Sequence, residues 1–369
     1  MGQPHGIGVV GLGVILDAYL RTLADHPGVR LAAVADLDLA RAAAVAERVP
    51  GARALTVEAL LDDDEVDTVL DLTTPGAHAE VALACAAHGK AHYGEKPLAA
   101  TLEDARRVVA AAAAGGTGLG CAPDTVLGTG VQTARAAVDA GAIGRPTSAV
   151  ATWISPGHEA WHPNPDFYYR HGGGPLLDMG PYYLTSLVHL LGPVASVTGV
   201  AAGLRASRTI ASGPRAGESV PVEVATHVAG TLLHVGGAVS TVTMSFDGAG
   251  TRARPIEVHG EEGSLAVPDP NTFAGDVERF VPGGDWEVLP PSAGFVEASR
   301  GVGLLEMVGA AGLGGAPATP RAGGELALHV TELMAGLLRS ADEGRRVDLT
   351  TAPDRPDLVP LTPLATWKG

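Results

Sequence analysis

The N-terminal stretch Gly6-Ile7-Gly8-Val9-Val10-Gly11-Leu12-Gly13 places a glycine turn directly after a short apolar run. The apolar run predicts a buried strand, and the apolar spacing over 14–26 predicts a helix after the turn. Strand, glycine turn and helix in this order are typical of a dinucleotide-binding unit. Gly11 would make the tight turn, and Gly13 would let a pyrophosphate approach the helix N-terminus. Leu16 replaces the third glycine of the full motif, so an ordinary tight turn is the alternative.

An acidic residue follows the next apolar run. Leu31–Ala35 predicts the second strand and ends at Asp36, 25 residues after Gly11. A carboxylate at this position accepts hydrogen bonds from the adenosine ribose and repels a 2′-phosphate, so it favours NAD. NADP stays possible if Arg41 reaches a phosphate. The alternative role for Asp36 is capping of a helix over 38–48, because Asp is favoured before helices.

Strands and helices then alternate as far as Pro123, which predicts a parallel sheet with right-handed crossovers. Thr68–Leu72 and Ala91–Tyr93 are expected strands, with a helix over 77–88 between them. Ligands of such sheets bind beyond the carboxyl ends of the strands. For His78, local packing at the helix start is an equal alternative. The cofactor-binding residues predicted on these grounds are Gly11, Gly13, Val14, Ile15, Asp36, Thr73, Thr74, Pro75, His78, Glu95 and Lys96.

After Pro193, alternating β-branched stretches, among them one over 220–234, predict a large, open, mainly antiparallel sheet. Helices over 125–141, 296–311 and 324–343 are expected beside it. Such a sheet needs helices on one face, and its other face suits a subunit contact. The fold class is therefore α/β. The expected division is a Rossmann domain over 1–123, an α/β domain for substrate binding and oligomerisation over 124–345, and a C-terminal tail over 346–369.

A loop from His158 to Arg170 is rich in aromatic residues and proline, and a long irregular loop inside an enzyme is usually functional. His158, Trp161 and His162 are candidate substrate contacts, since they suit sugar hydroxyls and ring faces. The two histidines also have the spacing of helical metal ligands. Neighbouring prolines make a regular helix improbable and no second cluster completes a site, so we expect no metal.

A buried helix over 176–191 carries Asp178 and Tyr182, which are four residues apart and therefore share one helical face. The alternative for Tyr182 is a core tyrosine whose hydroxyl bonds to Asp178.

Charge and cysteine content limit the class of protein. The formal net charge is −16 and no basic cluster is present, which argues against nucleic acid and anionic membrane surfaces as partners. Cys85 and Cys121 have no metal-like spacing and suit small buried side chains. No leader and no membrane-spanning window is evident, so we expect a reduced cytoplasmic protein without disulfides.

Several motifs are spread over nearly the whole chain: Gly11-Leu12-Gly13, Thr74-Pro75 with His78, Gly89-Lys90-Ala91-His92, Glu95-Lys96-Pro97, Gly173-Gly174, Asp178-Met179-Gly180-Pro181-Tyr182 and Glu262-Gly263-Ser264. The two motifs centred on Lys96 and Asp178 are specific as a pair. Together these motifs resemble the Gfo/Idh/MocA oxidoreductases, a family that includes glucose-fructose oxidoreductase, inositol dehydrogenase and dimeric dihydrodiol dehydrogenase.

The resemblance implies a nicotinamide-binding Rossmann domain, a second domain with an open sheet, and a homodimer or homotetramer formed through that sheet. It places Lys96 at the nicotinamide and substrate, with a bond to Pro97 that is often cis. Many members have a histidine at the position of Tyr182. The tyrosine resembles the branch that contains glucose-fructose oxidoreductase and dihydrodiol dehydrogenase. At Pro123-Asp124-Thr125 the chain lacks the aromatic and arginine segment of many relatives.

These residues predict oxidation or reduction of a secondary alcohol or carbonyl in a sugar, polyol or dihydrodiol. A free phenol ionises near pH ~10, and a neighbouring cation favours the phenolate. Tyr182 is thus the expected proton-transfer group. Lys96 is expected to supply the cation beside it and to donate a hydrogen bond to the substrate oxygen. Asp178 is expected to orient Lys96 or the substrate. Two rivals remain: an NAD-dependent glycoside hydrolase on the same fold, and a non-catalytic NAD-binding sensor.

Overall fold

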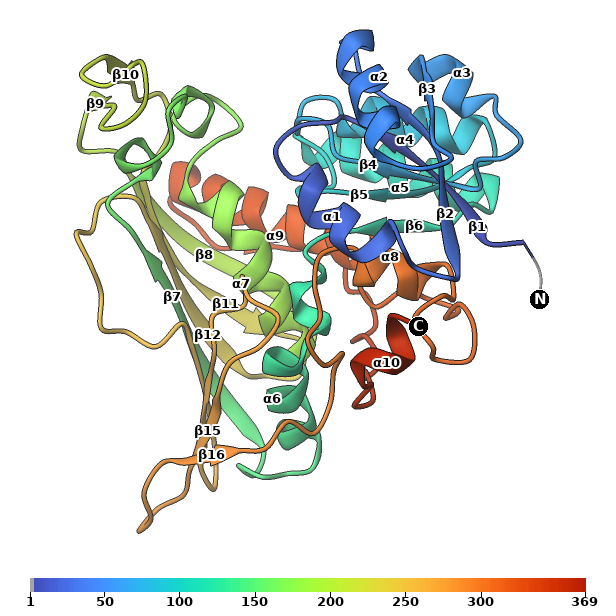
Figure 1. Cartoon of the computed structure of the whole chain (residues 1–369). Coiled ribbons are helices and arrows are strands. Elements are labelled where there is room, and N and C mark those ends of the chain that lie inside the picture. The colour runs from blue at the N-terminus through green and yellow to red at the C-terminus, as the bar shows by residue number, and fades with distance from the viewer. Residues whose placement is uncertain (1–2) are drawn as a thin grey trace. The chain divides into compact units, whose positions relative to one another are not determined.

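The structure is a computed structural model that describes residues 3–369 (Figure 1). The chain forms two compact units. Unit 1 contains the chain up to Gln132 together with Pro291–Thr331 and Pro356–Gly369, and unit 2 contains Thr133–Pro290 and Glu332–Arg355. Both units are discontinuous in sequence, whereas the expected domains 1–123 and 124–345 were continuous segments.

Unit 1 contains a six-stranded sheet in the order β3-β2-β1-β4-β5-β6. Every neighbouring pair in it is parallel, as the alternation of strands and helices predicted. The strands are β1 (His5–Val10), β2 (Val29–Ala35), β3 (Arg53–Leu55), β4 (Thr68–Asp71), β5 (Ala91–Gly94) and β6 (Leu119–Cys121). The helices between them are α1 (Leu16–Leu23), α2 (Leu39–Arg48), α3 (Val57–Leu61), α4 (His78–Ala87) and α5 (Leu102–Gly115).

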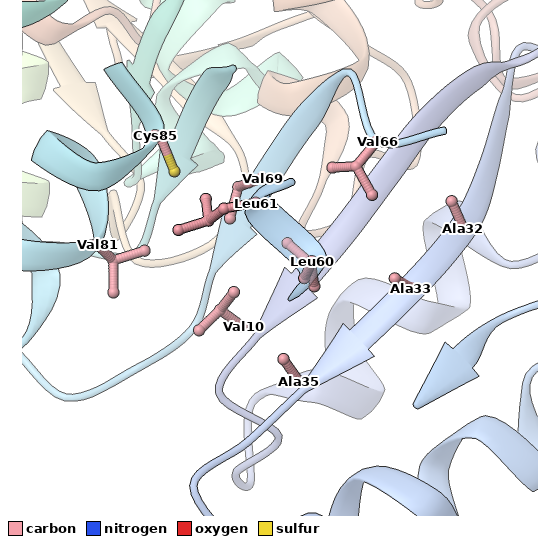
Figure 2. Packing of buried hydrophobic residues seen from close by; sticks show 10 residues of the cluster. All are labelled: Val10, Ala32, Ala33, Ala35, Leu60, Leu61, Val66, Val69, Val81 and Cys85. Carbon is pink, nitrogen blue, oxygen red and sulfur yellow. The ribbon is translucent and has the colours of Figure 1, made fainter. Parts of the chain in front are cut away.

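Small and β-branched side chains fill the core beside this sheet. An added Cβ on Gly8 would lie 2.8 Å from Leu60 Cδ2, so α3 packs directly on β1 only because position 8 is glycine. Cys85 is a buried free thiol in the same cluster, as expected from its apolar surroundings. Figure 2 shows the cluster, which consists of Val10, Ala32, Ala33, Ala35, Leu60, Leu61, Val66, Val69, Val81 and Cys85.

The last residues of the described chain pack into unit 1. Trp367, in α10 (Leu364–Trp367), is fully buried, and its Nε1 donates to the Val296 carbonyl at 2.9 Å. His26 Nε2 donates to the Trp367 carbonyl at 2.9 Å. Residues 356–369 therefore contribute buried side chains to unit 1, whereas the sequence indicated only a tail.

A helix expected over 296–311 is much shorter in the structure. The observed helix is α8 (Val302–Met307), which begins after Gly301 at a φ of 102°. The backbone before it is extended: Phe295 N donates to the Leu127 carbonyl at 3.0 Å and Val296 N to the Thr362 carbonyl at 2.9 Å. These bonds between distant segments replace the helical hydrogen bonds that the local sequence favours.

Unit 2 contains a nine-stranded sheet in the order β16-β15-β14-β13-β7-β12-β11-β8-β17. All neighbours are antiparallel except β7 and β12, which are parallel. The strands are β7 (Pro146–Ile154), β8 (Val194–Ala202), β11 (His227–His234), β12 (Val239–Ser245), β13 (Ile256–Gly260), β14 (Ser264–Val267), β15 (Val277–Phe280), β16 (Glu287–Leu289) and β17 (Val347–Asp348).

The expected strand over 220–234 is divided in two. Its first part is β10 (Ser219–Pro221), which pairs with β9 (Ser207–Thr209) in a separate two-stranded sheet. Its second part is β11 in the large sheet. The division falls directly after Pro221, which has no N–H to donate to a ladder.

Helices lie on one face of the nine-stranded sheet, as predicted (Figure 1). The buried helix α7 (Pro175–Leu191) contacts β7, β11 and β12. Ser340, in the part of α9 (Gly324–Glu343) that belongs to unit 2, accepts a hydrogen bond from Gly199 N at 2.9 Å. Other strand residues alternate outward and include exposed Val150, Val200 and Val239. The remaining helices are η1 (Asp124–Leu127), α6 (Thr129–Asp139), η2 (His158–Ala160) and η3 (Asp166–Tyr168).

Candidate active site

In the glycine turn after β1, the surrounding protein atoms require a glycine at position 11 but not at position 13. Gly11 has a φ of 86°, and an added Cβ would lie 2.7 Å from Leu72 C and from Thr73 N. An added Cβ on Gly13 would meet no protein atom within 4 Å. Protein packing therefore explains Gly11, whereas no protein atom near position 13 requires a glycine there.

The helix that follows this turn is suited to a phosphate. No side chain caps the N-terminus of α1, where Ile15 occupies the N-cap position. Uncapped N–H groups and the helix dipole favour an anion there. Val14 is fully exposed beside them. The predicted residues Gly13, Val14 and Ile15 thus lie together at an open, uncapped helix start.

Asp36 holds the glycine turn in place. Its Oδ2 accepts from Leu12 N at 2.9 Å, and its Oδ1 accepts from Asp38 N at 2.9 Å. Partial burial raises the pKa of Asp36, but the hydrogen bonds from Asp38 and Leu12 and the nearby Arg41 guanidinium together lower it by more, so the net shift is downward. Asp38, and not Asp36, caps α2 by accepting from Ala40 N and Arg41 N. The helix-cap alternative for Asp36 is therefore wrong.

His78 lies between two loops that follow neighbouring strands. Its Nδ1 lies 2.6 Å from the Pro97 carbonyl and its Nε2 lies 3.1 Å from the Thr73 carbonyl. Asp71, at the end of β4, accepts from Thr73 N at 2.9 Å and Thr73 Oγ1 at 2.6 Å. His78 is buried, as its local-packing interpretation requires, and its ring nitrogens face a backbone carbonyl of each loop. Thr74 and Pro75 are exposed in the first loop.

The Lys96 turn is anchored through Glu95. Glu95 Oε1 accepts from the Tyr19 hydroxyl at 2.8 Å and lies 3.6 Å from Arg300 Nη1. Glu95 Oε2 accepts from Lys96 N at 3.1 Å. The Lys96–Pro97 bond is cis, as the family resemblance implied. The side chain of Glu95 thus fixes the backbone that presents Lys96.

The turn in which the chain departs from many relatives is structural. Asp124 is fully buried in unit 1, and its Oδ2 accepts from Gly301 N at 2.8 Å and from Gly303 N at 3.2 Å. Burial raises the pKa of Asp124 to about 6, although Arg300 and the two backbone hydrogen bonds oppose that rise. Asp124 therefore links η1 to the start of α8. No local signal in the sequence indicates these contacts, because Gly301 and Gly303 follow Asp124 by 177 and 179 positions.

Unit 2 supplies the second predicted group of residues. Asp178 and Tyr182 lie on α7, one helical turn apart, and Tyr182 is buried. Ser186 Oγ donates to the Tyr182 carbonyl at 2.8 Å. His158 Nε2 lies 2.7 Å from Asp178 Oδ2. Of the three predicted substrate contacts, Trp161 is 60% exposed, His162 is partly buried and His158 is buried.

A buried ionic network supports the loop that contains these residues, and the sequence alone did not predict it. Arg208 is almost fully buried, donates to Glu159 Oε1 at 3.0 Å and also bonds to Asp247. The Tyr169 hydroxyl donates to Glu159. Burial, and then the bond to Glu159, raises the pKa of Tyr169. Arg208 also donates to the carbonyls of Pro156 and Phe246, both at 3.2 Å. The loop start is thereby fixed.

Two further findings concern absent features. Among residues 3–369, no group of three or more His, Cys, Asp or Glu side chains is arranged to hold a metal ion. Within the same described range, no helix is both long enough and apolar enough to cross a bilayer.

Comparison with known proteins adds to this geometry. Residues 5–120 match the family model described as oxidoreductase family, NAD-binding Rossmann fold, and residues 131–266 match the GFO/IDH/MocA C-terminal domain. The chain belongs to the Gfo/Idh/MocA family. Residues 5–120 are its NAD-binding domain, and NAD is the cofactor that this domain binds. The open glycine turn, the uncapped helix and Asp36 fit that cofactor.

Curated relatives match part of this family member. Over 112 residues it is 45% identical to inositol 2-dehydrogenase 2 of Saccharopolyspora erythraea, covering 30% of the chain and 33% of the relative. Over 177 residues it is 33% identical to 1,5-anhydro-D-fructose reductase of Ensifer adhaerens, covering 47% of the chain and 52% of the relative. The chain thus spans about a third to a half of the length of these relatives.

Solved structures share the fold over almost the whole chain. An NAD-binding oxidoreductase from Klebsiella pneumoniae superposes with a TM-score of 0.80 at 24% identity, covering 95% of this chain and 100% of the other. Levoglucosan dehydrogenase in complex with NADH and L-sorbose superposes with a TM-score of 0.78 at 20% identity, again covering 95% of this chain and 100% of the other. At these identities the likeness establishes the fold alone.

Proposed function

We propose that the chain is an NAD-dependent oxidoreductase that transfers a hydride between the nicotinamide and a secondary alcohol or carbonyl of a sugar, polyol or dihydrodiol. The observation that carries this proposal is the anchored Lys96 turn. Glu95 holds the Lys96 backbone, and His78 bonds to the adjoining Pro97 carbonyl or to that of Thr73, next to the NAD-binding glycine turn of the same unit. The names of the relatives, inositol 2-dehydrogenase and 1,5-anhydro-D-fructose reductase, support a polyhydroxylated substrate.

The proposed cofactor contacts follow from the same unit. Gly11, Gly13, Val14 and Ile15 would bind the pyrophosphate through the turn and the helix N-terminus. Asp36 would accept from the ribose hydroxyls and disfavour a 2′-phosphate, which favours NAD over NADP. The other proposed contacts are Thr73, Thr74, Pro75, Glu95 and Lys96, in the loops that follow β4 and β5, and His78, at the start of α4.

The proposed chemistry assigns one task to each group. Bound NAD supplies the hydride acceptor. Tyr182 removes the hydroxyl proton as the hydride leaves, and it returns the proton in the reverse direction. Lys96 donates a hydrogen bond to the substrate oxygen and stabilises negative charge on that oxygen. Asp178 orients the reacting groups through its carboxylate.

Trp161 and His162 are the proposed outer substrate contacts. The exposed indole of Trp161 offers an apolar face for a sugar ring, and the His162 ring packs edge-on against it with ring centroids 5.3 Å apart. Burial lowers the pKa of His162, and the nearby His158 ring lowers it further. A neutral imidazole suits a neutral, hydroxylated substrate.

Two wider properties are also proposed. The exposed Val150, Val200 and Val239 on the outward face of the nine-stranded sheet support a homodimer or homotetramer formed through that face. The two free, buried cysteines support a reduced, cytoplasmic location.

The decisive experiment measures initial rates of NADH formation from NAD, with NADP in parallel, over a panel of aldoses, inositols, polyols and trans-dihydrodiols. Wild type is compared with Tyr182→Phe and Lys96→Met. Tyr183→Phe is the matched control, because the Tyr183 hydroxyl bonds to Asp269 at 3.4 Å and has no role in the proposed reaction.

We expect one substrate class to yield NADH with wild type and Tyr183→Phe, and turnover at least ~100-fold lower with the other two variants. Retention of most turnover by both Tyr182→Phe and Lys96→Met would overturn the assignment. Cleavage of aryl glycosides without net NADH would identify a hydrolase, and NAD binding without any reaction would identify a sensor.

A further inference from the structure

We propose that His158 is a positioning residue that holds the Asp178 carboxylate in one orientation, and that it does not contact the substrate. This inference rests on the proposed function, because Asp178 is one of its acting groups. It also replaces the direct sugar contact that the sequence suggested for His158.

The contact itself is short and well sheltered. His158 Nε2 and Asp178 Oδ2 are 2.7 Å apart, and the side chains of the two residues are 9% and 17% exposed. A hydrogen bond to an ionised acceptor is stronger than one between neutral groups, and low solvent access preserves that strength. One of the two Asp178 oxygens is therefore committed to His158.

Aromatic rings surround the imidazole. The centroid of the His158 ring lies 4.2 Å from that of Tyr168, 4.9 Å from Phe246, 5.2 Å from Trp161 and 5.9 Å from Trp153. Ring packing of this kind fixes the rotamer of a side chain. The imidazole can therefore present Nε2 in only one direction, toward Asp178.

The backbone of His158 is fixed as well. Its carbonyl accepts from His162 N at 2.7 Å and from Trp161 N at 3.1 Å. The next residue, Glu159, is held by Arg208 and Tyr169 in the buried network described above. The position of His158 is thus set by unit 2 itself.

The second ring nitrogen selects the tautomer. Within residues 3–369, His158 Nδ1 is a buried atom without a hydrogen-bond partner. A proton on Nδ1 of the neutral ring would leave that N–H unsatisfied and would place the Nε2 lone pair against a carboxylate. The neutral ring is therefore protonated at Nε2 and donates to Asp178. With its nitrogens so placed, the ring has no donor left for a sugar.

The role of such a contact is positional. A small displacement of a group that acts in the reaction lowers the turnover rate more than it lowers substrate affinity. We expect His158→Phe, which keeps a ring in the aromatic cage but removes the donor, to lower kcat by about 10- to 100-fold. The KM for the sugar should stay within about twofold of wild type, since no substrate contact is lost. His158→Gln restores a donor near the Nε2 position and should recover most of kcat.

The test combines this kinetic series with a measurement that needs no activity. Imidazole N–H resonances are recorded by NMR for wild type, His158→Phe and Asp178→Ala. We expect a resonance protected from exchange with water that disappears in both variants and has the Nε2–H tautomer. His234→Phe controls for the loss of a buried imidazole in unit 2, since His234 bonds to Ser240 Oγ at 2.7 Å and Gly192 O at 2.8 Å.

Each other outcome would overturn the proposal. An increase in KM with kcat unchanged in His158→Phe would make His158 a substrate contact. A loss of activity that His158→Gln fails to rescue, and that follows thermal stability as in His234→Phe, would make its role purely structural. Absence of the protected resonance would show that the pair does not form. If wild type oxidises none of the sugars, the proposed function fails, while the resonance still reports on the pair.

Discussion

Replacing Arg208 with methionine should strongly destabilise unit 2. The Arg208 side chain is 1% exposed, and those of its partners Glu159 and Asp247 are 9% and 19% exposed. Methionine fills a similar volume but removes the cation, so two poorly solvated carboxylates lose their counter-ion. Breaking a buried ion pair by removing one partner costs about 3–5 kcal/mol.

This loss can be expressed as a melting temperature. For a unit of this size, 1 kcal/mol corresponds to roughly 2–4 °C, so we expect the transition of unit 2 to fall by about 6–20 °C. The measurement is differential scanning calorimetry at neutral pH, supported by urea unfolding. Arg145→Met is the control, because Arg145 and its partner Glu261 are 75% and 51% exposed. Exposed pairs contribute little, so this variant should melt within about 2 °C of wild type.

Equal small shifts for Arg208→Met and Arg145→Met would refute the reasoning. Recovery of the stability of Arg208→Met in high salt would also refute the reasoning, because salt screens exposed charges and has much less effect on buried ones. A double variant with Glu159→Gln should recover part of the loss, since the glutamine amide needs no counter-ion.

Three further changes test the nucleotide-binding unit. Gly11→Ala should lower both the melting temperature and NAD affinity because of its overlap with Leu72 and Thr73, whereas Gly13→Ala should weaken NAD at least ~10-fold by calorimetric titration at an unchanged melting temperature. Asp36→Ser should raise kcat/KM for NADP relative to NAD at least ~10-fold, and an unchanged ratio would contradict its role at the ribose. Asp124→Asn should flatten the pH dependence of stability. Because the folded pKa of Asp124 is about 6 against an ordinary 3.8, its stabilising contribution is full below about pH 4 and is lost as the pH rises past 6, by about 3 kcal/mol in total. Melting curves from pH 4 to 8 measure it, and a profile identical to wild type would contradict the prediction.

Much of the fold is encoded in local patterns. The apolar run before Gly11 and the regular alternation after it predicted the parallel sheet, because strand and helix periodicities are properties of short windows. The buried helix with Asp178 and Tyr182 on one face was predicted for the same reason. Burial of Cys85 was likewise evident from its neighbours.

Long-range contacts were not predictable in this way. Arg208 meets Glu159 across 49 positions and Asp124 meets Gly301 across 177, and nothing in either neighbourhood indicates the partner. The segment before α8 has a helical pattern but is extended, because its backbone bonds to residues near 127 and 362. For His158, composition suggested a sugar contact, whereas its bond to Asp178 depends on how the loop folds back onto α7.

The interleaved order of the two units has a consequence for synthesis on the ribosome. The six strands of unit 1 emerge first, but Trp367 and the segment at Val296 that receives its indole emerge only after nearly all of unit 2 has been made. The core of unit 1 therefore stays incomplete while the nine-stranded sheet of unit 2 is translated. During that interval its exposed apolar surface is a natural substrate for chaperones, and stalling before residue 356 should produce a chain prone to aggregation.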